Sequence, residues 1–154
     1  MIYLTFKVPS AESPWRKTWD SVNQVDPGEL NEIDIRYKYF GANVHLLIDD
    51  VEVVSKKRFV TLVDFALSIS HAVKRLSSGE DAAIGFTESE EVIRLHSDDS
   101  LVAISSSKHS WEVSVDREEF IVVLTDFLRQ VHSRLMAEFP WLAADPVIQR
   151  FSVR

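Results

Sequence analysis

The stretch that decides the fold is residues 111–139, WEVSVDREEFIVVLTDFLRQVHSRLMAEF. Its first residues alternate like a short strand, and the rest repeats apolar side chains at intervals of three and four, which predicts a long helix with one buried face. The side chains on that face are Phe120, Val123, Leu124, Phe127, Leu128, Val131 and Leu135. Asp116 is placed to cap this helix, with Glu119 three residues on as in a capping box, and Pro140 ends it.

The part of the chain before residue 55 predicts strands. Residues 2–8 alternate apolar and polar side chains, as a strand with one buried face does. Residues 32–40 alternate in the same way and predict a second strand, and residues 44–48 return as its hairpin partner after a short turn. A tight turn at Asp49–Asp50 then leads into another short strand at 51–54.

A second helix is predicted over residues 57–76, with Ser55 as its cap. Its apolar face carries Phe59, Leu62, Val63, Ala66, Ile69, Val73 and Leu76. Lys56, Lys57 and Arg58 would then lie at the positive end of the helix dipole, which is unfavourable. Either the helix begins later or these three cations have another use.

Four further short strands follow at nearly even spacing, at residues 82–87, 91–96, 101–106 and 110–115. The turns between them leave no room for crossover helices, so the strands are expected to form an antiparallel meander. With only two long helices in the chain, the predicted fold class is α+β: an antiparallel, curved, multi-stranded sheet packed by two long helices.

The length of 154 residues fits a single domain, residues 1–154. Residues 9–30 form a loop-rich N-terminal segment, and residues 140–154 form a C-terminal tail in which 147–153 could add a last strand. The absence of cysteine excludes disulfides and thiolate metal sites. The first residues lack the pattern of a secretory signal, and the longest apolar runs are far shorter than the roughly 20 residues that span a bilayer. The expected localisation is cytoplasmic, without membrane contact.

The sequence offers no pattern typical of catalysis or of metal binding. The histidines are His45, His71, His96, His109 and His132. They form no H-x-x-x-H pair and no ligand spacing with carboxylates, and there is no G-x-S-x-G, G-x-G-x-x-G, P-loop or calcium loop. His71 and His132 lie late in predicted helices, where a cation suits the dipole, and His96 and His109 could meet across the meander. We therefore expect no enzyme, no catalytic residue, no metal and no cofactor.

Acidic residues outnumber basic ones by 24 to 17, which gives a formal net charge of −7. This balance disfavours unaided nucleic-acid binding, because neutralising phosphates requires clustered Lys and Arg. The acidic side chains on the turns of the meander are Glu88, Glu90, Glu91, Asp98 and Asp99. Such charges most often form a solvated face, but on a rigid scaffold they could also present a negative field to a cationic protein partner.

Trp15 and Trp19 lie four residues apart in PWRKTWDSV. A short helical turn would place both rings on one side, where they could cover the core edge or anchor a partner. The candidate partner-binding residues are thus Glu88, Glu90, Glu91, Asp98, Asp99, Trp15 and Trp19.

Residues 62–95, with LVDFALSISHAVKRL followed by IGFTESEEVIRL, resemble small uncharacterised bacterial proteins, and in overall character the chain is similar to bacterial immunity proteins of contact-dependent growth inhibition and other polymorphic toxin systems. The resemblance is one of general character: small, acidic, free of cysteine, α+β and without a catalytic motif. It implies a protein that neutralises a cognate toxin, a basic domain, by covering its active or binding surface, and it carries over no residue. Two alternatives come from the residues alone: a homo-oligomeric structural or regulatory module that uses an open sheet edge and the tryptophans, and a small-ligand enzyme with a pocket between sheet and helices.

Overall fold

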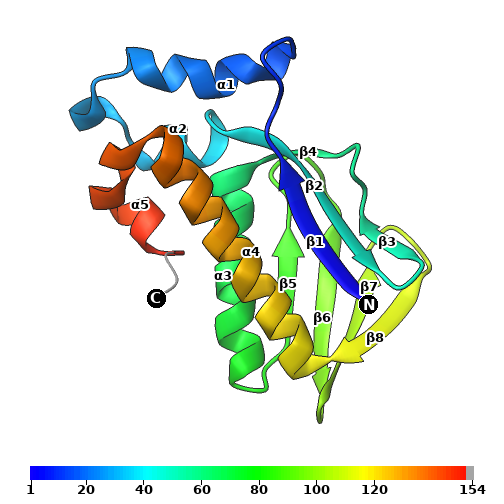
Figure 1. The fold of residues 1–154 in the computed structure, drawn as a ribbon. Helices are drawn as coiled ribbons and strands as arrows, with labels where there is room; N and C mark the ends of the chain where they lie inside the picture. Colours follow the sequence, from blue (N-terminus) through cyan, green and yellow to red (C-terminus); the bar gives the residue numbers. More distant parts are fainter. Residues whose placement is uncertain (152–154) are drawn as a thin grey trace.

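The chain folds into two antiparallel sheets of four strands each, together with helices that include two long ones, α3 and α4 (Figure 1). The computed structural model describes residues 1–151. The first sheet contains β1 (Ile2–Lys7), β2 (Gly41–Ile48), β3 (Val51–Val54) and β4 (Phe59–Thr61). The second contains β5 (Ala82–Gly85), β6 (Val92–Asp98), β7 (Leu101–Ser106) and β8 (Glu112–Asp116). The predicted α+β class is confirmed, and its strands are divided between two sheets.

Strand β2 is the centre of the first sheet. It pairs with β1 along Ile2–Lys7 on one side, and with β3 and β4 in succession on the other. Its side chains alternate, so Ala42, Val44, Leu46 and Ile48 are buried while the residues between them face outward. The predicted hairpin at Asp49–Asp50 is present, with Asp49 at a φ of 50°.

The second sheet is the predicted meander, in the order β5-β6-β7-β8. Ile93, Leu95, Val102 and Ile104 form its buried face. Because successive hairpins of a meander turn at opposite ends of the shared strand, the loop before β6 and the turn after it lie at opposite ends of the sheet (Figure 1).

Helix α4 (Arg117–Glu138) has the predicted cap and the predicted buried face. Asp116 Oδ2 accepts a hydrogen bond from the Glu119 N–H at 2.9 Å. Phe127 is fully buried and contacts Phe6 and Phe65 edge to face, with ring centroids 5.7 and 5.8 Å apart. The other buried residues of this helix are Phe120, Leu124, Leu128, Val131 and Leu135, while Val123 is partly buried.

The strand predicted at residues 32–40 is wrong, because this segment forms the short helix α2 (Glu32–Tyr37). The side chain of Asn31 caps the helix by accepting the Asp34 N–H at 2.9 Å. Ile35 is buried whereas Ile33 is exposed, so the apolar residues of the apparent alternation do not share an environment. The hairpin expected with residues 44–48 is replaced by the pairing of β2 with β1.

Helix α3 (Leu62–Ser77) begins five residues later than predicted, and residues 59–61 form β4 instead. Strand β4 pairs with the start of β2, from Gly41 to Asn43. Lys56, Lys57 and Arg58 thus precede both β4 and the helix. Of the two readings offered for these cations, a later helix start is confirmed.

The segments predicted as loop and tail contain short helices. Residues 9–30 include η1 (Pro14–Arg16), α1 (Lys17–Asp20), η2 (Ser21–Gln24) and η3 (Pro27–Glu29). The tail contains η4 (Pro140–Ala144) and α5 (Pro146–Gln149). The strand considered at 147–153 is wrong over its described part, because Asp145 accepts the Val147 N–H at 2.9 Å and Pro146 opens a helical turn; residues 152–154 lie outside the described residues.

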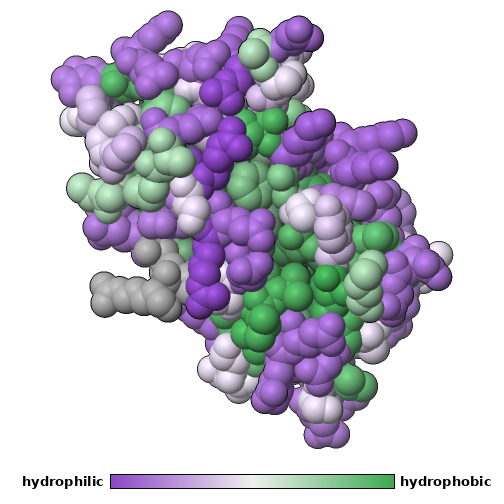
Figure 2. All heavy atoms as spheres, viewed as in Figure 1, coloured by the Kyte–Doolittle hydropathy of each residue, from purple (hydrophilic) through white to green (hydrophobic). Residues whose placement is uncertain are grey.

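The buried apolar residues of both sheets and both long helices form one hydrophobic cluster. Helices α3 and α4 pack side by side, α3 against β5 and α4 against β1 (Figure 1). Figure 2 shows polar side chains along the outer face of α4 and apolar ones in the strip between α4 and β1. Within residues 1–151, no helix has the length and apolar content needed to cross a bilayer.

Candidate binding surface

Two separate hollows lie beside the start of α3, and the packed segment between them shares lining residues with both. One hollow, the aromatic notch, has a volume of about 200 Å³. It is lined by Trp15, Thr18, Tyr37, Lys38, Gly41, Phe59, Val60, Thr61 and Glu88. The other, the polar hollow, has a volume of about 460 Å³. It is lined by Arg36, Asp64, Leu67, Ser68, His71, Gly85, Phe86, Thr87 and Arg150.

The aromatic notch is held in place by the backbone of Gly41. The Trp19 indole donates to the Gly41 carbonyl at 2.8 Å, and Thr18 Oγ1 accepts the Gly41 N–H at 3.0 Å. These bonds fix α1 against β2. A Cβ at position 41 would lie 2.5 Å from Phe59 Cε1, so glycine is the residue that lets the Phe59 ring lie over this strand. The Trp15 ring then stacks on Phe59, with centroids 4.3 Å apart.

The two tryptophans do not share a face, and only Trp15 is available to a partner. Trp15 is 53% exposed, whereas Trp19 is fully buried against Phe40 and Phe139. Trp15 lies in the 3₁₀ turn η1 and Trp19 in α1. Because a 3₁₀ turn has three residues per turn, positions four apart are not stacked across it as they are in an α-helix. The proposal of Trp19 as a partner-binding residue is therefore corrected: it is a core residue.

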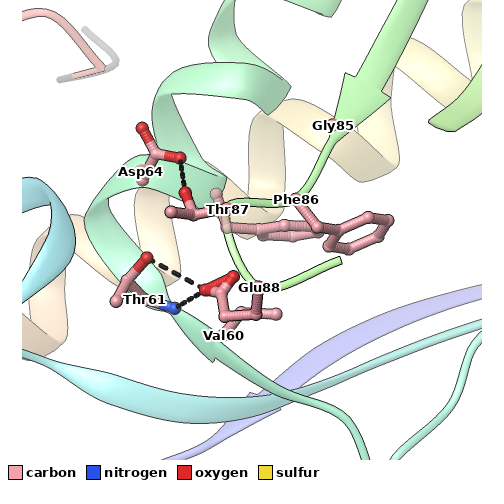
Figure 3. Close-up of a pocket in the computed structure, with 8 residues that line it drawn as sticks. Val60, Thr61, Asp64, Gly85, Phe86, Thr87 and Glu88 are labelled. Carbon is pink, nitrogen blue, oxygen red and sulfur yellow. Dashed lines mark hydrogen bonds between the residues drawn. The ribbon is translucent and has the colours of Figure 1, made fainter. Parts of the chain in front are cut away.

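Between the two hollows, the loop after β5 is bonded to the start of α3 (Figure 3). Glu88 Oε1 accepts the Thr61 N–H at 2.8 Å and the Thr61 hydroxyl at 3.1 Å. Thr61 is the N-cap residue of α3, so Glu88 binds one of the N–H groups at this helix start. The Thr87 hydroxyl donates to Asp64 Oδ2 at 2.7 Å. Both bonds hold the loop in position.

The polar hollow contains charged groups that are already paired. Arg36 donates from Nε and Nη2 to Asp64 Oδ1 at 2.9 and 2.7 Å, and this hydrogen-bonded carboxylate raises the pKa of Arg36. Arg150 Nη1 lies 3.3 Å from Glu32 Oε1. The Ser68 hydroxyl accepts the Gly85 N–H at 3.3 Å. The hollow thus presents polar groups for recognition, and none of these contacts pairs a nucleophile with a base.

Glu91, one of the predicted partner-binding residues, is only 2% exposed. Its carboxylate is hydrogen-bonded by Arg58 Nη2 and by the Ser106 hydroxyl, both at 2.5 Å, and His109 Nε2 lies 3.7 Å away. Desolvation raises the pKa of Glu91, but the hydrogen bonds from Ser106 and Arg58 outweigh it and hold the pKa below its usual range. Glu91 therefore connects the two sheets and is not part of a free acidic surface.

The other acidic candidates are exposed but lie in two places. Glu88 and Glu90 lie in the loop between β5 and β6, whereas Asp98, the last residue of β6, and Asp99, in the turn that follows, lie at the opposite end of β6. These exposed charges are therefore divided between the two ends of the second sheet and do not form one acidic surface. Of the seven predicted residues, the structure brings together Trp15 and Glu88, in the aromatic notch.

His96 and His109 lie at different ends of the second sheet. His96 Nδ1 lies 3.1 Å from both carboxylate oxygens of Asp81, and His109 approaches Glu91 at the other end of the meander, so the contact considered between His96 and His109 is not formed. Within residues 1–151, no group of three His, Asp or Glu side chains is arranged to hold a metal ion.

Sequence reasoning missed Tyr37 and Phe59, which complete the notch. The sequence patterns predict a strand around Tyr37 and place Phe59 on the buried face of a helix. The signal for Tyr37 was the Asn31 cap followed by acidic residues in the first helical turn, which would have predicted α2.

Comparison of the chain with protein-family models, with curated proteins and with solved structures found no match.

Proposed function

We propose that this chain is a cytoplasmic binding protein, an immunity protein that neutralises a cognate toxin by covering its active surface. The observation that carries the proposal is the aromatic notch. Trp15 and Tyr37, 53% and 43% exposed, stand on a fixed scaffold beside the acidic loop of Glu88 and Glu90. Exposed aromatic anchors with a charged rim are typical of the surfaces that dominate binding energy in protein complexes.

The net charge of −7 supports a basic protein partner. Complementary charge accelerates encounter and orients the partner, while apolar anchors provide most of the affinity. We place the contact at the end of the second sheet that carries Glu88 and Glu90, because this end adjoins the notch. Inhibition would be steric. The proposal assigns no catalytic step, cofactor or metal, and it involves neither nucleic acid nor membrane.

The experiment is co-expression with the product of the adjacent upstream gene. Growth arrest caused by that product should be relieved by this chain, and the two proteins should purify together. The proposal fails if growth stays arrested, or no complex forms, although both proteins are present in folded form.

A pair of charge reversals locates the contact. Glu90→Lys should slow association with the toxin several-fold at low salt, whereas Asp99→Lys, at the opposite end of β6, should leave the rate within about twofold. Equal effects of both substitutions would contradict a contact at the notch.

The alternative function, a homo-oligomeric module, would use the same exposed side chains as its interface. Trp15, Tyr37 and the exposed Ile33 could be buried between two copies of the chain. Under our proposal, light scattering shows a monomer at micromolar concentration. A dimer that Trp15→Ala dissociates would favour the alternative.

A further inference from the structure

We infer that the aromatic notch receives a cationic side chain of the partner, specifically the guanidinium of an arginine, with Glu88 as its counter-ion. This inference rests on the proposed function and specifies the group that the toxin inserts. The ring faces, the volume and walls of the notch, and the second carboxylate oxygen of Glu88 support it.

The rings of the notch suit a planar cation. Trp15 lies against Phe59 and is still 53% exposed, and Tyr37 is 43% exposed. The electron-rich faces of tryptophan and tyrosine attract cations, and arginine is the cation that stacks on them most often. Tyr37 already accepts such a contact, with Arg36 Cζ 5.1 Å from its ring centre.

The size and walls of the notch fit an arginine side chain. Its volume is about 200 Å³, and its lining is dominated by Trp15, Tyr37, Phe59 and Val60. An arginine buries its three methylene groups along apolar walls while its charged end reaches a polar group. Glu88 supplies a polar group of the required sign in this lining.

The Glu88 carboxylate is positioned in advance. Its Oε1 is bound by Thr61, which fixes the side chain, and within residues 1–151 its Oε2 accepts no hydrogen bond. A guanidinium can therefore bond to Oε2 without disturbing the bonds to Thr61. Charge-assisted bonds of this kind are about twice as strong as neutral ones.

Lys38 also lines the notch, and its positive charge makes it possible to test whether the occupant is a cation or an anion. Its ammonium group lies 5.2 Å from the Tyr39 ring centre. If the occupant is a cation, Lys38 repels it, and Lys38→Gln should strengthen binding. If the occupant is an anion, the same substitution should weaken binding.

The test uses the full chain and follows its four tryptophan indole N–H signals by two-dimensional NMR. The Trp15 signal is identified by its loss in Trp15→Phe. The probes are N-acetyl-arginine amide, its neutral analogue N-acetyl-citrulline amide, and N-acetyl-leucine amide. We expect the arginine probe at millimolar concentration to shift the Trp15 signal and to leave the Trp19, Trp111 and Trp141 signals in place. An equal shift with citrulline, or a larger one with leucine, overturns the inference.

Three variants complete the test. Glu88→Gln keeps an oxygen that can bind Thr61 and should weaken arginine binding about threefold, as loss of an exposed ion pair does. Lys38→Gln should strengthen it, and Glu118→Gln, an exposed residue on α4, serves as the control. The position of the buried Trp19 signal reports whether each variant is folded. If these probes fail while the toxin still binds, the inference is wrong and the proposed function stands. If no toxin binds, the proposed function fails.

Discussion

Arg58 and Glu91 join the two sheets through an ion pair of 2.5 Å. Arg58 lies just before β4 in the first sheet, and Glu91 just before β6 in the second. The Arg58 guanidinium also lies 4.3 Å from the Phe86 ring centre. One buried carboxylate therefore helps to hold Arg58 against the loop that carries Glu88 and Glu90.

Removing this carboxylate should destabilise the protein. Glu91→Ala should lower the free energy of unfolding by about 2–4 kcal/mol, because a partly buried guanidinium and the Ser106 hydroxyl lose their partner. The exposed neighbour provides the control: Glu90→Ala should change it by less than about 0.5 kcal/mol. Urea denaturation measures both, and similar values for the two variants would contradict the role given to Glu91.

The same carboxylate predicts an acid dependence. Because the folded-state pKa of Glu91 is lowered, its contribution to stability is present above the ordinary glutamate pKa of about 4.3 and is lost as pH falls through the folded-state value. The stability of Glu91→Gln should therefore fall less steeply than that of the parent between about pH 5 and pH 3. Parallel acid-unfolding curves for the two proteins would show that Glu91 is not responsible.

Asp81 and His96 should titrate as a pair. The hydrogen bond from His96 lowers the pKa of Asp81, and the carboxylate raises the pKa of His96. The stability that His96 contributes is present below the ordinary histidine pKa and is lost as pH rises through its raised value. NMR titration of the ring should show a pKa above about 6.5 that returns toward this value in Asp81→Asn.

The aromatic packing around Phe127 should be among the costliest to disturb. Phe127→Ala should destabilise the protein by about 3–5 kcal/mol, because it leaves a cavity between α4, β1 and α3. On the exposed side of the same helix, Val122→Ala should cost less than about 0.5 kcal/mol. Thermal unfolding of both variants tests this, and a small effect at Phe127 would be inconsistent with the packing described.

Gly41→Ala should alter the notch as well as the stability. The added Cβ would lie 2.5 Å from Phe59 Cε1, so the ring that supports Trp15 must move. We expect a loss of about 1–3 kcal/mol and a displaced Trp15 indole signal. The control is Gly85→Ala, where a Cβ meets no atom within 4 Å. An unmoved Trp15 signal in Gly41→Ala would show that Phe59 does not fix the position of this ring.

The long amphipathic segments were predictable because their periodicity extends over many residues. Helix α4, its Asp116 cap and the meander follow from patterns that local exceptions do not disturb. Residues 32–40 show the limit: an alternation over so short a stretch fits either a strand or a brief helix, and the Asn31 cap decided for the helix. Both residues 2–8 and residues 32–40 were candidates to pair with β2, and contacts between segments distant in sequence selected the first of them, β1.

The candidate site was predictable only in part, for a related reason. Trp15 and Glu88 were identified by residue type, but their meeting depends on the Gly41 backbone and on the bond of Glu88 to Thr61. Glu91 looks like its neighbours in sequence, and its burial follows from Arg58, which lies 33 residues away. The composition therefore indicated that acidic and aromatic side chains would form the surface. Which of these side chains are exposed at the notch depends on tertiary contacts.

The attachment of Glu88 to Thr61 links the notch to the beginning of α3. A ligand that binds Oε2 keeps the bonds of Oε1 to Thr61 and restrains the Glu88 side chain that makes them, so the Thr61 N–H just before α3 should exchange more slowly with solvent. Amide hydrogen exchange at Thr61 would thus report occupancy of a site that the exchanging proton never touches.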